Sequence, residues 1–192
     1  MGWFNKKSFD KKNTNWLRKE GEIAIRVDAT DIKSHWGTKP ITIYDGTAAL
    51  VFSKGELLGT LASGKHDIDG PIRKWLSADA PTVLILIDDG DINLDLDITS
   101  LYSKENISLD VSLSMTFQID RPEMFYTNIM KELGSYTTED LKKHLENELK
   151  DALLAFTSVH PIEDLYHNPT LKQETTIQMQ HRIGQNFGRI GF

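Results

Sequence analysis

The chain has 192 residues, of which 39% are hydrophobic and 26% are charged, and its formal net charge is −6 at pH 7. This composition is too apolar for a disordered chain and predicts one soluble globular domain, or one domain with a small appendage. The chain contains no cysteine, which excludes disulfides, thiolate metal sites and a cysteine nucleophile. No apolar run reaches the roughly 18–20 residues needed to cross a bilayer, so we expect a cytoplasmic protein.

Residues 1–20 form a basic and aromatic arm without a clear hydrophobic period. The arm carries six basic and two acidic side chains, a net charge of +4, which leaves −10 for the rest of the chain. An acidic body argues against nucleic acid as a partner. The arm itself suits the inner face of an anionic membrane, and a disordered tail explains its composition equally well. The candidate membrane-binding residues are Trp3, Phe4, Lys6, Lys7, Lys11, Lys12 and Trp16.

Short strands follow the arm. The segment EIAIRVD at 22–28 alternates between apolar and polar residues, which predicts a strand. Asp45-Gly46 and Lys54-Gly55 are natural two-residue hairpin turns, because glycine accepts positive φ. Further strands are expected at 41–44, 47–53, 57–61, 83–88 and 91–98.

The segment ISLDVSLSMTFQI at 107–119 has the clearest strand pattern. Every second residue from Ile107 to Ile119 is apolar, and every residue between them is polar. Such alternation predicts a strand with one buried face and one solvated face, as in antiparallel sheets.

Helical periodicity begins after residue 119. Asp120 is expected to cap a first helix, with Pro122 in its first turn and Gly134 at its end. A second helix starts at Thr137 or Thr138 and carries a stripe of apolar residues from 141 to 156 at steps of three and four. A short third helix opens at Pro161, and a fourth runs from about 169 to 189. The predicted class is α+β, with a twisted, mainly antiparallel sheet in the first two-thirds and packed helices after it.

The stretch GTLASGKH at 59–66 imitates a phosphate-binding loop. Gly59, Gly64 and Lys65 have the spacing of that motif, but His66 stands where serine or threonine would hold Mg²⁺. Gly70 and Pro71 follow at once, and no helical period comes after Lys65. We therefore interpret the stretch as part of a β-hairpin with glycine turns.

The acidic run DDGDINLDLD at 88–97 suggests a calcium loop. Asp89, Asp91, Asn93 and Asp95 occupy alternate positions, but the glycine and glutamate that a calcium loop requires are missing. The solvated face of an antiparallel strand is the favoured interpretation. No zinc spacing, catalytic constellation or cofactor motif was found, so neither a cofactor nor an enzymatic activity is expected.

Three segments together resemble the stomatin–prohibitin–flotillin (SPFH, or band 7) domain. They are GTAALVFSKGELLGTLASGKHDIDGP at 46–71, ISLDVSLSMTFQIDRPEMF at 107–125, and the helical region from 137 to the final Gly-Phe. His66 suits a Leu-x-x-Gly-x-His-like element of that family, and Asp120-Arg121-Pro122 is similar to its Asp-Pro-x-x-Phe helix start. The resemblance covers residues 41–192 and is to a bacterial-type member without a transmembrane segment. The chain ends at Phe192, where such proteins commonly continue into a coiled coil.

The resemblance implies a single domain over residues 21–192 that acts as a scaffold rather than as an enzyme. Such a domain would form homo-oligomers and organise a membrane surface or partner proteins. The alternative is a soluble protein-binding module without a membrane role. A calcium-binding or nucleotide-binding protein is the third hypothesis.

Overall fold

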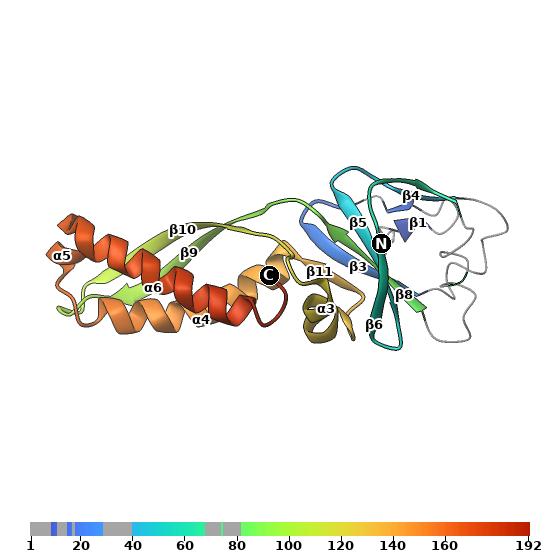
Figure 1. Cartoon of the computed structure of the whole chain (residues 1–192). Helices are drawn as coiled ribbons and strands as arrows, with labels where there is room; N and C mark the ends of the chain where they lie inside the picture. The colour runs from blue at the N-terminus through green and yellow to red at the C-terminus, as the bar shows by residue number, and fades with distance from the viewer. Residues whose placement is uncertain (1–8, 11–14, 17, 29–39, 68–73, 75–81) are drawn as a thin grey trace, which may run out of the picture. The chain divides into compact units, whose positions relative to one another are not determined.

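The computed structural model describes residues 9–10, 15–16, 18–28, 40–67, 74 and 82–192 (Figure 1). These residues belong to two compact units. Unit 1 comprises Met1–Asp91, Gln118–Thr137 and Gly191, and unit 2 comprises Ile92–Phe117, Thr138–Ile190 and Phe192.

Unit 1 contains two β-sheets. The first has the strand order β1-β2-β4-β7 and is built from β1 (Phe9–Asp10), β2 (Asn15–Trp16), β4 (Ile41–Ile43) and β7 (Gly64–His66). The second has the order β11-β3-β8-β5-β6 and is built from β3 (Glu22–Asp28), β5 (Thr47–Ser53), β6 (Glu56–Leu61), β8 (Thr82–Asp88) and β11 (Ser135–Thr137). Only β2 and β4 pair in parallel among the described strands, so the expectation of a mainly antiparallel sheet is confirmed.

Both faces of the five-stranded sheet are buried at its central strands, β3, β8 and β5. On one face, Val51 and Leu84 are paired across β5 and β8, and they belong to a core cluster that includes Ile41 and Ile43 of the other sheet. On the opposite face, Phe52 stacks on Tyr126 with a centroid separation of 4.0 Å. Two covered faces explain why β5 and β8 are almost continuously apolar instead of alternating.

The first predicted helix differs from its expected form. Helix α3 spans only Pro122–Phe125 and continues as a π-helical turn, η1 (Tyr126–Met130). The expected cap was wrong: Arg121 occupies the N-cap position and no side chain caps the helix. The backbone N–H groups of Asp120 and Arg121, just before the helix, donate to the carbonyl oxygen of Gly191, each at 3.1 Å.

Unit 2 consists of a long hairpin and three helices. Strands β9 (Ile92–Tyr102) and β10 (Ser108–Phe117) pair antiparallel, with a bulge between Leu109 and Val111. Helices α4 (Thr138–Thr157), α5 (Ile162–His167) and α6 (Pro169–Phe187) follow, and α4 contacts both β9 and α6 (Figure 1). Asn168 caps α6, because its side-chain oxygen accepts hydrogen bonds from the N–H groups of Thr170 and Leu171.

The predicted stripe of α4 forms the centre of unit 2. Leu141, Leu145, Leu149 and Leu153 are all buried, as their spacing predicts, whereas Phe156 is half-buried. The order of strands followed by helices confirms the predicted α+β class. Within the described residues, every helix is too short or too polar to span a bilayer.

Candidate functional site

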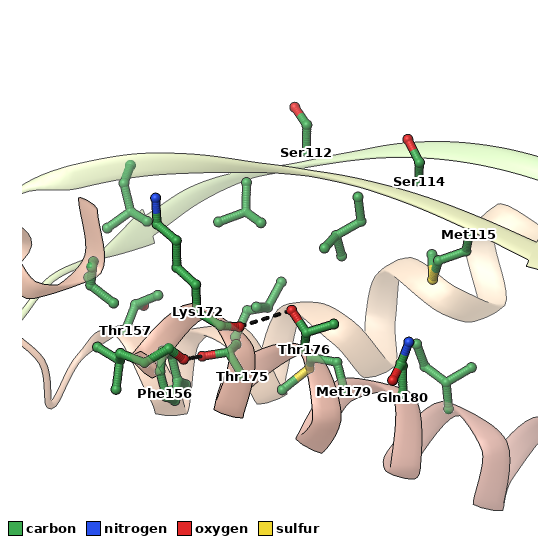
Figure 2. A pocket seen from close by; sticks show the side chains of 17 residues that line it. Ser112, Ser114, Met115, Phe156, Thr157, Lys172, Thr175, Thr176, Met179 and Gln180 are labelled. Carbon is green, nitrogen blue, oxygen red and sulfur yellow. Dashed lines mark hydrogen bonds between the residues drawn. The ribbon is translucent and has the colours of Figure 1, made fainter. Parts of the chain in front are cut away.

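An apolar groove opens between β10 and α6 in unit 2, with a volume of about 440 Å³ (Figure 2). Strand β10 contributes Leu109, Val111, Leu113 and Met115 to its wall. Helix α6 contributes Leu171, Thr175, Met179 and Ile183 from the opposite side, and Leu153 and Phe156 of α4 also line it. The volume of the groove therefore lies within the range of about 300–1,000 Å³ that small-molecule sites usually have.

The groove exists because α4 covers only one strand of the hairpin. The inward residues of β9, Ile92, Leu94, Leu96 and Ile98, are all at most 4% exposed. On β10, the same face is buried at Leu109 and Phe117 but only half-buried at the three residues between them, Val111, Leu113 and Met115. The alternating pattern correctly predicted an apolar face at 107–119, but the middle of that face is not covered by the helices.

The α6 wall contributes three uncharged polar side chains to the groove, Thr175, Thr176 and Gln180. The hydroxyl of Thr175 donates to the carbonyl oxygen of Leu171 at 2.7 Å, and that of Thr176 donates to Lys172 at 2.9 Å (Figure 2). Both threonines therefore use their hydroxyl hydrogens within their own helix. Ser112 and Ser114 point to the other face of β10 (Figure 2). Lys172 is the one charged residue among the 17 that line the groove.

Aromatic rings and a carboxylate hold other parts of unit 2 together. Phe117 lies 5.6 Å from Phe187 and 6.0 Å from Phe192, measured between ring centroids. In the turn between β9 and β10, Glu105 accepts a hydrogen bond from Ser103 at 2.8 Å and another from the backbone N–H of Ile162 at 3.0 Å. Ile162 is the first residue of α5, so this carboxylate satisfies an N–H that has no partner within the helix.

Glu105 gives the turn a pH dependence. The hydrogen bond from Ser103 is the largest cause that lowers the pKa of this carboxyl below its ordinary value of 4.5, and the bond from Ile162 acts in the same direction. A lowered folded-state pKa means that the carboxylate stabilises the fold fully above the unfolded-state value. This contribution is lost as the pH falls through the folded-state pKa.

We predict that Glu105→Gln lowers the melting temperature of the protein at pH 7, and that the difference from the wild type shrinks toward pH 3. Glutamine keeps the shape but loses the charge that strengthens both hydrogen bonds. Thermal unfolding followed by circular dichroism at both pH values measures the effect. Glu146→Gln, at an exposed position of α4, is the control. An equal effect of Glu105→Gln at the two pH values would contradict the role of the ionised form.

The candidate membrane residues of the arm are only partly placed. Trp3, Phe4, Lys6, Lys7, Lys11 and Lys12 lie outside the described residues. Trp16 is described, and it is 4% exposed within the core cluster of unit 1. Its indole N–H donates to the carboxylate of Glu22 at 2.8 Å, so this ring has a structural partner inside the domain. The membrane assignment of the other six residues stays a prediction.

The structure places the phosphate-loop imitation in β-strands. Gly59 lies inside β6, and the segment from Gly64 to His66 is β7, which pairs antiparallel with β4. His66 is in hydrogen-bonding contact with the carbonyl oxygen of Ala62 at 2.7 Å through Nε2. A strand at Lys65 is incompatible with the loop and following helix that bind phosphate. The nucleotide-binding hypothesis is therefore wrong for this stretch.

The acidic face of β9 forms a ladder of cross-strand hydrogen bonds. Ser112 donates to Asp97 and Ser114 donates to Asp95, both at 2.7 Å. Thr116 donates to Asn93 at 2.8 Å. These side chains are exposed, as the interpretation of a solvated strand face requires. In the part of the chain that the structure describes, no three histidine, aspartate or glutamate side chains gather as a metal-binding group.

Comparison with known proteins identifies the family. The family model described as "SPFH domain / Band 7 family" matches residues 41–192, which run through both units. No protein among the curated sequences compared matches the chain. The family match covers well over half of the sequence and agrees with the order of strands and helices. The chain therefore belongs to the SPFH domain / Band 7 family.

Proposed function

We propose that this chain is a non-enzymatic scaffold domain that forms homo-oligomers and organises an anionic membrane surface or partner proteins. The observation that carries the proposal is the family match over residues 41–192, since a domain of this family is expected to act as a scaffold rather than as a catalyst. The chemistry of the groove is consistent with that role. Its lining has one charged side chain, Lys172, whereas acid–base catalysis commonly needs groups placed to accept and donate protons.

The arm supplies the proposed membrane contact. Each basic residue near an anionic leaflet contributes about 1 kcal/mol, so a net charge of +4 contributes roughly 4 kcal/mol. That free energy alone corresponds to about millimolar affinity for one copy. Stable attachment then requires several copies that bind together, or the insertion of aromatic side chains of the arm.

Flotation with anionic vesicles tests the membrane role. Replacement of the arm's Lys6, Lys7, Lys11 and Lys12 by glutamine reduces its net charge from +4 to 0, and we expect most of the vesicle-bound protein to be lost. The matched control makes the same charge change at four exposed lysines elsewhere: Lys65, Lys104, Lys143 and Lys150. Equal recovery of the two variants would contradict a specific role of the arm. Mass photometry of the wild type at several concentrations tests oligomer formation separately.

A soluble module that binds a protein partner is the second candidate function. Large apolar side chains on or beside α5 and α6 favour it, because Val159 is 61% exposed, Tyr166 is 59% exposed and Ile177 is 57% exposed. Scattered exposed residues of this kind are common on protein surfaces. They therefore support a partner-binding module less strongly than the family match supports a scaffold function. A negative flotation result together with a stable monomer would favour this second function.

A further inference from the structure

We propose that the groove between β10 and α6 binds a single aliphatic chain that ends in an anionic head group, such as a long-chain fatty acid. Three observations support this site: its narrow apolar interior, its satisfied threonine hydroxyls and its one cation. The inference does not depend on the scaffold function, because a monomer could bind such a molecule without any membrane contact.

The size of the groove favours a thin occupant. The inward stripe of β10 from Leu109 to Met115 is about 20 Å long at the usual rise of a strand. An α-helix of that length has a diameter of about 10–12 Å and fills more than roughly 1,500 Å³. The groove holds about 440 Å³, so it cannot enclose a whole helix, whereas a single aliphatic chain fits along it.

The lining also disfavours an extended peptide. Each residue of a peptide brings one backbone carbonyl and, unless it is proline, one N–H, and these groups must find partners when they are buried. The hydroxyl hydrogens of Thr175 and Thr176 are already used in α6, and the apolar side chains of β10 offer no strong donor. Gln180 is the one uncharged side chain of the α6 lining with N–H groups for a peptide carbonyl. An aliphatic chain has no polar groups along its length, so it buries its surface without that cost.

Lys172 defines the expected head group. Its side chain rises from α6 across the groove toward β10 (Figure 2). Its ammonium group has no ion-pair partner among the described residues. The chain outside residues 1–20 carries a net charge of −10, so a cation beside an apolar groove in this acidic body gives an anionic head group a specific place to bind. A carboxylate or a phosphate would satisfy this chemistry.

Titration calorimetry with sodium oleate, below its micelle concentration, tests the site. We expect saturable binding of one oleate per chain. Lys172→Gln should weaken oleate binding about fivefold, the upper range for one exposed ion pair, and should leave the binding of neutral oleyl alcohol unchanged. A parallel titration with oleoyl lysophosphatidate distinguishes a phosphate head group from a carboxylate head group. The ligand that binds more tightly carries the preferred head group.

Variants of one strand distinguish the groove from the rest of the surface. Leu113→Asn, on the groove face, should weaken oleate binding tenfold or more because it removes apolar contact area. Thr116→Asn, on the opposite face of β10 and outside the groove lining, should leave the affinity unchanged. Leu113 is half-buried, so its substitution should not unfold unit 2, and circular dichroism checks this. Thr175→Phe fills the groove instead of making it polar, and it should also abolish binding.

Hydrogen exchange identifies the segments that oleate covers. Protection is expected in 109–115 and 171–183 of the wild type. Absence of oleate and lysophosphatidate binding by the folded wild type would overturn the proposal. Binding that Leu113→Asn and Thr175→Phe leave unchanged would overturn it as well, because the occupied site would then lie elsewhere. A dimer that Leu113→Asn dissociates, without any lipid binding, would show that a second copy covers the groove and would also reject the proposal.

Discussion

Replacing Gly191 by alanine is expected to lower the free energy of unfolding by about 3 kcal/mol or more. Gly191 has a φ of +103°, a conformation that side chains rarely adopt. A Cβ atom at this position would lie 2.5 Å from the backbone nitrogen of Phe125 and 2.7 Å from the carbonyl oxygen of Arg121. Both neighbours are backbone atoms, so the clash cannot be relieved by a change of rotamer.

The carbonyl group of Gly191 adds to this effect. Its oxygen accepts hydrogen bonds from the N–H groups of Asp120 and Arg121, each at 3.1 Å, at the start of α3. A shift of residue 191 away from Phe125 would lengthen these bonds, and Phe125 is itself fully buried. The substitution therefore combines backbone strain with the loss of hydrogen bonds at the start of α3.

Urea denaturation measures the difference, with Gly184→Ala as the matched control. Gly184 lies inside α6, and a Cβ there would meet nothing within 4 Å. Alanine is the better helix former by about 1 kcal/mol, so this control is expected to leave stability unchanged or to raise it slightly. A Gly191→Ala protein whose stability is within 0.5 kcal/mol of the wild type would show that the final turn adapts and that Gly191 is not required.

The sequence predicts best those parts of the fold in which one face is repeatedly apolar. Strand β10 and helix α4 match their predicted positions within two residues, because an amphipathic period of two or of about 3.6 reflects burial directly. Strands β3, β5 and β8 match within one residue, because short apolar runs bounded by turn residues indicate buried strands. The π-helical turn after α3 and the short strand β11 were not predicted. Both are too short for a period to appear, and packing against the rest of unit 1 determines them.

The groove illustrates a second limit of sequence patterns. The alternation from Ile107 to Ile119 predicted which side chains of β10 share a face, and the structure confirms that face. Periodicity does not reveal whether a neighbouring element covers the face completely. The α6 pattern carried a weak signal, because polar Thr175 stands between Leu171 and Met179 at a spacing of four where a fully packed helix would have an apolar residue.

Trp16 shows how composition can mislead at a single residue. It follows the lysines of the arm, so the composition of the arm suggested that this ring inserts into a membrane interface. In the structure its ring belongs to the core cluster, together with Ile25 and Ile41. Its N–H is bonded to Glu22, a carboxylate that is 8% exposed and also accepts a hydrogen bond from the backbone of Lys19. A buried indole with a buried acceptor stabilises the fold, and its burial argues against contact with lipid.

We therefore predict that Trp16→Ala lowers the free energy of unfolding by about 3–5 kcal/mol, the usual cost of removing a large buried aromatic side chain. Trp16→Phe keeps most of the apolar area but removes the N–H, which leaves Glu22 with one donor fewer. We expect a smaller loss of about 1–3 kcal/mol. Leu58→Ala in β6, at a position 37% exposed, is the control and should change stability by less than about 1 kcal/mol.

Unfolding in urea and vesicle flotation, measured on the same Trp16 variants, separate the structural role from the membrane role. If the ring is structural, Trp16→Phe loses stability but floats with anionic vesicles as well as the wild type does under conditions in which both are folded. A Trp16→Ala protein that keeps wild-type stability and loses vesicle binding would contradict this account and assign the ring to the membrane contact. Because the ring is buried and hydrogen-bonded, substitutions at Trp3 and Phe4, rather than at Trp16, are the ones that test insertion of the arm into lipid.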